Sequence, residues 1–384
     1  MTKQATEVPV NIFDLMELAK QRPNAISLGL GDPDFATPDH IVAAAKQAID
    51  EGRTGAAPPT GLLELRQAIA RKLARDNGVL VDPEHEVLVT TGGQEALFLL
   101  IQGLIEPGDE VLVPDPRYPS YDQAIELAGG RIVLVPTTEA SAFELLPEEV
   151  ERRITAKTKV LLLISPNNPT AGINTPETVR RLAEIAQERD LIVIADEIYE
   201  SFVYDGWEHL SIASLPGMRE RTITLNGMSK SYAMTGWRIG YLAAPPEFIR
   251  TVSALKEMVN VQAPTVSQWA SVAALDGPQE CVAEMRRTYQ ERRDLLMPIL
   301  RDMGFTFSDP RGGLYIWANT AATGIESTAL SYLLLKEGNV LVFPGTGFGT
   351  NWGDYVRMTL LQPKDVLLDV VERMRRVLEQ HALS

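Results

Sequence analysis

The sequence predicts an α/β protein with a mostly parallel sheet and a second, smaller α+β domain. Between about residues 85 and 245, short apolar runs alternate with helical patterns, which is typical of parallel sheets. These runs are continuously apolar rather than alternating with polar residues, as expected of strands that helices cover on both faces. In the C-terminal third, long helical patterns surround only short strand candidates, so we expect the smaller domain there.

The alternating region contains six expected strands, which are Glu86–Thr90, Glu110–Val113, Arg131–Val135, Lys159–Ile164, Leu191–Ala195 and Thr222–Leu225. The helices expected between them are Gln94–Ile105, Tyr118–Leu127 and Pro176–Arg189. The last of these helices follows Thr175 and starts with Pro176. A threonine can cap the helix start, and proline suits the first helical position, where its missing N–H has no partner to lose.

The C-terminal third has three long helical patterns, Glu247–Met258, Gln279–Met303 and Pro363–His381. Short strands are expected at Leu314–Ala318 and Tyr355–Thr359. We therefore expect a large domain over residues 46–280 and a small domain made from residues 1–45 and 281–384. No long or low-complexity linker separates them.

Composition narrows the classes of function. The 384 residues include 36 Lys and Arg against 51 Asp and Glu, for a net charge of −15. Such a surface repels nucleic acid and anionic membranes, so neither is expected as a partner. A local basic pocket can still bind a small anion against the overall sign.

No metal site or disulfide is expected. The single cysteine, Cys281, cannot form an intrachain disulfide or a Cys-rich metal site, and the four histidines show no ligand pair. The N-terminus lacks the pattern of a signal peptide, and no apolar run approaches the ~20 residues that span a bilayer. We expect a cytoplasmic protein.

Polar and glycine residues follow five of the expected strands. They are Thr90–Gln94, Asp115–Tyr118, Ser165–Thr170, Asp196–Tyr199 and Asn226–Lys230. Ligands of open α/β sheets bind beyond the carboxyl ends of the strands. We therefore expect a glycine turn, an aromatic ring, an amide, a carboxylate with a phenol, and an amine at one edge of the sheet.

Each of these residues alone has an ordinary structural explanation. Lys230 could be a surface lysine, Asp196 a helix cap and Arg238 a salt-bridged arginine. Gly92 and Gly93 could merely turn the chain, although free N–H groups at a helix start also bind phosphate. Together, an amine, a buried acid, a phosphate cradle and an arginine match the needs of pyridoxal phosphate.

The segment from Ser229 to Tyr241, SKSYAMTGWRIGY, resembles the lysine signature of class I/II aminotransferases. Asn168-Pro169-Thr170 and Asp196–Tyr199 resemble two further motifs of this family, as do Gly31–Phe35 and Arg357 within YVRMTL. The likeness runs from about residue 11 to residue 380. It implies the fold of type I pyridoxal-phosphate enzymes, with a seven-stranded, mostly parallel sheet between helices.

The resemblance implies a role for each matching residue. Lys230 would bond to the cofactor aldehyde and later move the proton between the substrate Cα and the cofactor C4′. Asp196 would pair with the protonated ring nitrogen. Asn168 and Tyr199 would hydrogen-bond the phenolate oxygen, and Tyr118 would stack on the ring. Of these, Lys230, Asp196 and Tyr199 are the expected catalytic residues.

Phosphate and substrate contacts follow from the same resemblance. The phosphate would be held by Gly92, Gly93, Gln94, Ser229 and Arg238. The substrate would be bound by Gly31, Asn168 and Arg357, with Arg357 clamping its α-carboxylate in a bidentate manner. The resemblance also implies a homodimer with shared active sites.

The main departure from the family pattern is at Ala56, and two smaller ones are at Ala171 and Gly227. The family pattern usually has a tyrosine at the position of Ala56, and the resemblance implies that such a tyrosine would reach the cofactor phosphate of the neighbouring subunit. Either the contact is absent here or a neighbour such as Arg53 replaces it.

The expected reaction is transfer of an α-amino group from an L-amino acid to a 2-oxo acid. Aspartate, alanine and larger neutral amino acids all remain open as donors. Arg117 and Arg311 are candidates to bind a second substrate carboxylate, while Ile12, Phe13 and Tyr315 could line an apolar side-chain pocket. The alternatives are a β-lyase or synthase on the same scaffold, and a non-catalytic regulatory binding protein.

Overall fold

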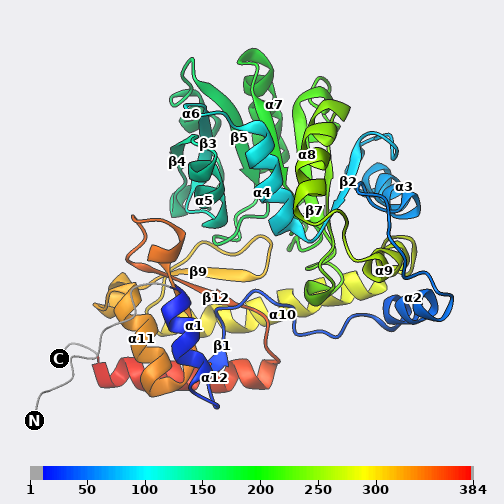
Figure 1. Cartoon of the computed structure of the whole chain (residues 1–384). Coiled ribbons are helices and arrows are strands. Elements are labelled where there is room, and N and C mark those ends of the chain that lie inside the picture. Colours follow the sequence, from blue (N-terminus) through cyan, green and yellow to red (C-terminus); the bar gives the residue numbers. More distant parts are fainter. Residues whose placement is uncertain (1–11, 382–384) are drawn as a thin grey trace, which may run out of the picture.

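A seven-stranded sheet forms the centre of the computed structural model, which describes residues 12–381 (Figure 1). Its strands run in the order β2-β8-β7-β6-β5-β3-β4. Their bounds are β2 Val87–Thr90, β3 Glu110–Asp115, β4 Arg131–Pro136, β5 Thr158–Ile164, β6 Ile192–Asp196, β7 Thr222–Gly227 and β8 Gly240–Ala243. Strand β8 runs opposite to the other six strands, so the predicted mostly parallel sheet is confirmed.

Helices cover both faces of this sheet. One face packs on α4 (Gly93–Leu104), α5 (Ser120–Leu127) and α8 (Pro246–Val259), and the other packs on α6 (Pro147–Glu151) and α7 (Pro176–Glu188). Along β5, Leu162 and Ile164 face the first group of helices, while Leu161 and Leu163 face the second. Both faces of the strand are therefore buried, which explains its continuously apolar sequence.

The predicted elements of this region are confirmed to within a few residues. The side chain of Thr175 accepts a hydrogen bond from the N–H of Thr178, and Pro176 is the first helical residue. Strand β8 was not predicted, because four residues that begin with glycine are too short to show a pattern. Other helices missing from the prediction are α1 Ile12–Lys20, α2 Asp39–Asp50, α3 Leu63–Lys72, α6, α9 Thr265–Asp276 and α11 Ser327–Gly338.

A second layer of structure lies below the carboxyl edge of the large sheet (Figure 1). It contains an antiparallel sheet of β11 (Phe343–Pro344), β12 (Tyr355–Thr359) and β9 (Tyr315–Asn319). The short parallel pair of β1 (Ile26–Ser27) and β10 (Val340–Leu341) joins the N-terminal segment to this part.

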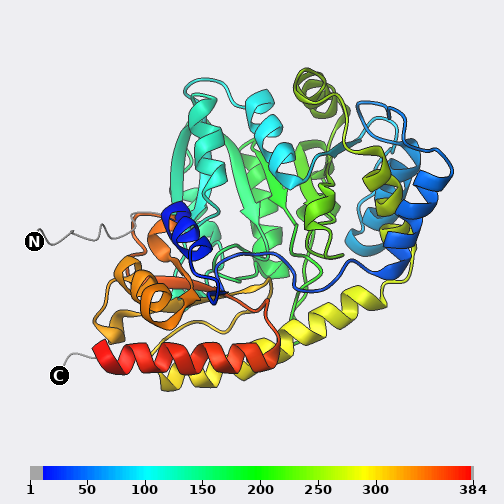
Figure 2. The same ribbon diagram turned by 60° about the horizontal axis from the view of Figure 1, so that its bottom comes forward.

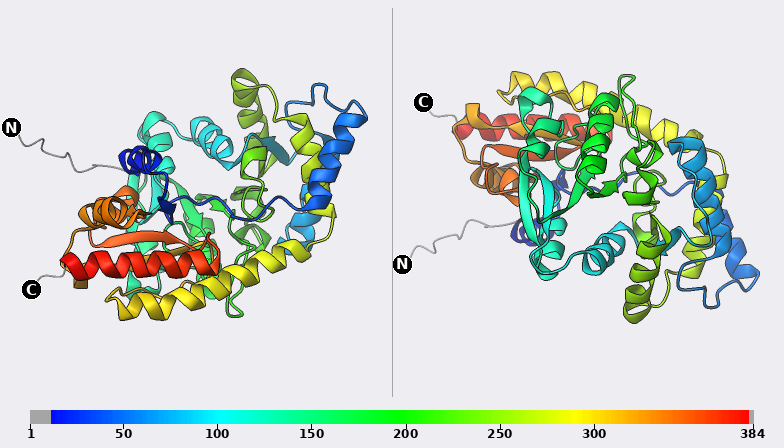
Figure 3. Two further views of the ribbon diagram at one scale, coloured as in Figure 1. Left: turned by 90° about the horizontal axis from the view of Figure 1, so that it is seen from below. Right: turned by 90° about the horizontal axis from the view of Figure 1, so that it is seen from above.

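Two long helices, α10 (Glu280–Asp302) and α12 (Lys364–His381), close the underside of this layer. They lie side by side in Figure 2. At the opposite end of the molecule, α2 packs on α9 (Figure 3). The domain boundaries expected near residues 46 and 281 stay a prediction, and residues 1–11 and 382–384 lie outside the described chain. No helix within residues 12–381 has both the length and the apolar character to cross a membrane.

Candidate active site

A cavity of about 310 Å³ lies between the carboxyl edge of the large sheet and the β9–β12 layer. Its lining includes most of the site residues predicted from the sequence, which are Gly31, Gly93, Gln94, Tyr118, Asn168, Asp196, Tyr199, Ser229, Lys230, Arg238 and Arg357. Segments that are more than 300 residues apart in the sequence thus meet at one place. Gly92 does not line the cavity but lies directly behind Arg238.

Lys230 lies in the loop that follows β7. Its Nζ donates a hydrogen bond to the carbonyl oxygen of Gly31 at 2.7 Å. Burial lowers the pKa of Lys230 to about 8, and Arg357 and Arg238 act in the same direction against the opposing charge of Asp32. About one tenth of this amine is therefore unprotonated, and nucleophilic, at pH 7.

Asp196 ends β6 and points into the cavity. Its Oδ2 accepts a hydrogen bond from the Tyr121 hydroxyl at 2.9 Å, and its Oδ1 accepts one from the N–H of Ile198 at 3.2 Å. Burial raises the pKa of Asp196 to about 6, although both hydrogen bonds oppose this. Within residues 12–381 no cationic side chain lies within 4 Å of this carboxylate, so a cationic group of a ligand would be a favourable partner.

Tyr121 was missed by the sequence analysis. It lies in the first turn of α5, whereas Tyr118 lies two residues before the helix begins. The carbonyl oxygen of Tyr118 accepts a hydrogen bond from the N–H of Tyr121 at 3.3 Å. The Tyr118 hydroxyl donates to Gln94 Oε1 at 3.2 Å. An i, i+3 pair of aromatic residues after a strand was the available signal, but it is common in helices that only pack against a core.

Arg357 is a buried cation on β12. Its Nη1 donates to Asn168 Oδ1 at 2.8 Å, and its Nη2 donates to the carbonyl oxygen of Gly29. Burial lowers the pKa of Arg357, and its Nε has no hydrogen-bond partner among the described residues. A buried charge without a carboxylate partner is costly, which favours an anionic ligand beside this guanidinium.

Two tyrosines complete the wall next to Arg357. The hydroxyls of Tyr199 and Tyr315 are 2.7 Å apart, and their rings meet edge to face with centroids 5.7 Å apart. Burial raises the pKa of Tyr199 well above its ordinary value. Its hydroxyl therefore remains protonated and able to donate a hydrogen bond into the cavity.

An anion cradle forms where β2 ends. Gly92 has φ +80° and precedes Gly93, the first residue of α4, so unpaired N–H groups at the helix start are available for an anion. A Cβ atom on Gly92 would lie 2.3 Å from Nη2 of Arg238. Only glycine permits this approach of the guanidinium, for which the structure has no carboxylate within 4 Å among the described residues. The donors suit a phosphate.

Three sequence candidates lie elsewhere. Arg117 is paired with Asp115 at 2.8 Å and also with Asp122, and Arg311 lies 4.0 Å above the ring of Trp207. Neither lines the cavity, so the idea that either binds a second substrate carboxylate is not supported. Arg53 pairs with Glu51 at 2.7 Å and lies over Trp269, while Ala56 is exposed.

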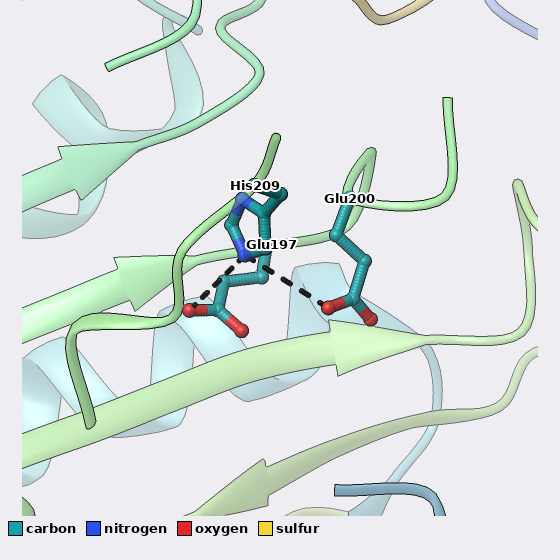
Figure 4. A group of neighbouring side chains, drawn as sticks. All are labelled: Glu197, Glu200 and His209. Atoms are coloured by element: carbon teal, nitrogen blue, oxygen red, sulfur yellow. Dashed lines mark ion pairs between the residues drawn. The ribbon is translucent and has the colours of Figure 1, made fainter. Parts of the chain in front are cut away.

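A second polar cluster consists of Glu197, Glu200 and His209 (Figure 4). Glu200 and His209 also line a separate cavity of about 430 Å³. His209 Nε2 is 3.5 Å from Glu197 and 3.9 Å from Glu200. Burial acts to lower the pKa of His209, but the carboxylates outweigh it and the net pKa is raised. Lys72 also pairs with Glu200. The carboxylates thus already face the amine of Lys72 and the imidazole of His209, which is typical of a structural polar network.

Comparison with known proteins points to one family. Residues 23–373 match the family model described as aminotransferase class I and II. Aromatic-amino-acid aminotransferase 2 of Thermococcus litoralis is 42% identical over 98% of this chain and 97% of its own length. Aspartate aminotransferase of Pyrococcus abyssi is also 42% identical, over 98% and 97%. The crystal structure of an aromatic aminotransferase from Pyrococcus horikoshii superimposes with a TM-score of 0.91 at 42% identity, over 95% of this chain and 99% of that one.

Proposed function

Because this chain belongs to the class I and II aminotransferases, we propose how its own residues divide the work of amino-group transfer. The protein is a pyridoxal-phosphate-dependent aminotransferase that moves an α-amino group from an L-amino acid to a 2-oxo acid. The alternatives of a β-lyase or synthase and of a non-catalytic binding protein have no counterpart among the relatives named above. The residue roles, the substrate class and the assembly that follow are our proposals.

One observation supports the site assignment above all others. Lys230, Arg238 and Arg357 line one cavity, and none has a carboxylate within 4 Å among the described residues. Three cations without ion-pair partners in a protein of net charge −15 match a ligand set with a phosphate, a carboxylate and a carbonyl carbon. The residues present therefore fit pyridoxal phosphate and an amino acid.

Lys230 and Asp196 would do the central chemistry. When bound, pyridoxal phosphate supplies an electron sink for the electron pair left on the substrate Cα. Lys230 would hold the cofactor through its aldehyde carbon and, once the amino substrate takes its place there, accept the proton from the substrate Cα. Asp196 would accept the N–H of the protonated ring nitrogen, and that positive charge would keep the carboxylate ionised.

The remaining residues would orient the two ligands. Asn168 and Tyr199 would donate to the phenolate oxygen, and Tyr118 would stack on the ring. The phosphate would bind to the cradle, whose residues are Gly92, Gly93, Gln94, Ser229 and Arg238. Arg357 would clamp the substrate α-carboxylate. Gly31 would lie beside this carboxylate, because glycine has no side chain to obstruct it.

We propose neutral amino acids, including aromatic ones, as the preferred donors. Lys230, Arg238 and Arg357 are the lysine and arginine side chains among the described lining residues, and each already has a role. A second carboxylate on the substrate would meet no further cation of the same chain. Tyr315 and Tyr118 offer apolar ring surface instead. The relatives named above include both an aromatic and an aspartate aminotransferase, so the choice needs a direct test.

We also propose a two-fold homodimer that shares its active sites, located in the cytoplasm. Apolar side chains of Met258, Val259 and Val261 are exposed, and Asn260 among them donates to Thr91 Oγ1 at 2.7 Å, next to the glycine turn. An exposed apolar segment at the cradle supports a partner subunit there. Light scattering tests this, and an active monomer would contradict it. The single cysteine, Cys281, supports a reducing compartment.

The decisive experiment is an absorption spectrum of the protein with pyridoxal phosphate and a panel of amino acids. A true donor moves the visible band of the bound cofactor to the near ultraviolet, and a 2-oxo acid restores it. We expect phenylalanine, tyrosine or leucine to do this at lower concentration than aspartate. Conversion by aspartate alone would overturn the proposed donor class. Release of pyruvate and ammonia without an acceptor would indicate a lyase.

A further inference from the structure

Tyr315 lies between Tyr199, which we propose binds the cofactor, and Arg357, which we propose binds the substrate carboxylate. It is the first residue of β9, is 2% exposed and lines the cavity. The sequence analysis considered it only for an apolar substrate pocket or the core. Its contacts indicate a more specific role, because its hydroxyl meets the hydroxyl of Tyr199 and its ring packs against Arg357.

Among residues 12–381, the hydroxyl of Tyr315 hydrogen-bonds with one side chain, that of Tyr199, at 2.7 Å. A phenol has a single O–H to donate. If Tyr199 donates this hydrogen to the cofactor oxygen, its own oxygen must accept from Tyr315. The direction of the bond between the two hydroxyls is then settled, and chained hydrogen bonds of this kind strengthen one another.

The ring of Tyr315 packs against the guanidinium of Arg357. The Cζ atom of Arg357 lies 4.3 Å from the ring centroid. The geometry of the sheet produces this contact, since Tyr315 pairs with Thr359 and Trp317 pairs with Arg357 across β9 and β12. Residues two apart on a strand share a face, so the ring and the guanidinium lie diagonally on the same side of the sheet.

The position of the Tyr315 hydroxyl also depends on Gly31. A Cβ atom at Gly31 would lie 2.6 Å from the Tyr315 oxygen, so any side chain there would displace it. The carbonyl oxygen of Gly31 in turn accepts from Lys230 Nζ. The hydroxyl therefore occupies a space that the surrounding residues leave open for it.

We propose that Tyr315 is a positioning residue that serves both ends of the site. Its hydroxyl turns the O–H of Tyr199 toward the cofactor oxygen, and its ring holds the plane of Arg357 for the substrate carboxylate. This inference rests on the roles proposed above for Tyr199 and Arg357. It separates two functions of one side chain, so two substitutions can test them independently.

The hydroxyl function is tested with Tyr315→Phe, which keeps the ring. This substitution removes one donor from the series of hydrogen bonds that ends at the cofactor oxygen, so that oxygen becomes more basic. We expect the midpoint pH of the visible band of the loaded protein to rise by about 0.5 pH unit. We expect the cofactor-free protein to bind pyridoxal phosphate about threefold more weakly in a fluorescence titration. The KM for the amino donor should remain within about twofold of the wild-type value, because the ring still packs on Arg357.

The ring function is tested with Tyr315→Leu. Loss of the aromatic face beside Arg357 should raise the KM for the amino donor by about tenfold, in addition to the change in midpoint pH. Tyr355→Phe is a matched control, since its hydroxyl donates to Glu139 at 3.1 Å and Tyr355 does not line the cavity. It should change neither quantity.

Tyr199→Phe distinguishes a failure of this inference from a failure of the proposed function. If Tyr199→Phe leaves the midpoint pH unchanged, the role proposed for Tyr199 is wrong. If it shifts the midpoint and Tyr315→Phe does not, the inference about Tyr315 is wrong. The double variant should equal Tyr199→Phe alone, because Tyr315 acts through Tyr199; additive shifts would overturn the inference. An equal rise in KM for Tyr315→Phe and Tyr315→Leu would refute the separate function of the ring.

Discussion

Replacing Lys230 by methionine should stabilise the cofactor-free protein, although it removes the residue proposed to hold the cofactor. Burial depresses the pKa of Lys230 from its ordinary 10.5 to about 8. At about 1.36 kcal/mol per tenfold change in the ionisation constant, the folded chain loses about 3.4 kcal/mol by keeping this amine protonated. The hydrogen bond to Gly31 offsets about 1 kcal/mol of that loss. We expect Lys230→Met to raise the free energy of unfolding at pH 7 by about 2 kcal/mol.

The pH dependence gives the sharper test. Between pH 8 and pH 10.5 the unfolded chain holds more protons at Lys230 than the folded chain does, so the stability of the wild-type protein rises with pH there. The advantage of Lys230→Met should be full below pH 8, shrink across this interval and reverse above it, where the wild-type protein keeps the hydrogen bond to Gly31 without the cost of ionisation.

Urea unfolding of both cofactor-free proteins, followed by circular dichroism at one protomer concentration, measures this advantage. Lys46→Met, at an exposed position on α2, should change stability by no more than about 0.5 kcal/mol. The reasoning is refuted if wild type is the more stable protein at pH 7, or if the gap is the same at pH 7 and pH 10.

Three further changes address the cofactor site. Ala56→Tyr should tighten pyridoxal phosphate binding by about ten- to a hundredfold by supplying a hydrogen bond to the phosphate of the neighbouring subunit; an unchanged dissociation constant in equilibrium dialysis would contradict this. Gly92→Ala places a Cβ atom 2.3 Å from Arg238 Nη2 at a residue with φ +80°. It should therefore weaken cofactor binding by at least about tenfold. Binding at wild-type strength would show that the cradle adapts to the added methyl group. Tyr121→Phe removes a donor to Asp196, whose pKa is already raised to about 6 by burial. The carboxylate should then be protonated at higher pH, so the pH below which the cofactor affinity of the cofactor-free protein falls should move upward; an unmoved profile would exclude this role of the hydroxyl.

Local sequence patterns predict most of the central sheet because its strands are buried on both faces. The run Lys159–Ile164 is recognisable as a strand without any tertiary information, and the observed β5 covers it. Strand β8 illustrates the limit. It lies between β2 and β7, and its four residues become a strand only because partners on both sides supply the hydrogen bonds.

The position of the site could also be predicted. The residues after β2, β3, β5, β6 and β7 are close in space because parallel strands end at one edge. Lys230 and Asp196 were found in this way, and both line the cavity. Their catalytic roles stay predictions, supported by the resemblance and by the burial of both groups.

Sequence order and apolar pattern by themselves determined the class of fold, the edge that carries the site and the residue types gathered there. Tertiary structure decided which charges are neutralised and which are left for a ligand. Arg117 and Arg357 are both arginines in expected site segments, but Arg117 meets two carboxylates whereas Arg357 meets an amide, a carbonyl and aromatic rings. Tyr199 and Tyr315 meet across 116 residues of chain. Such pairings depend on distances between separate elements, which no spacing along the chain reports.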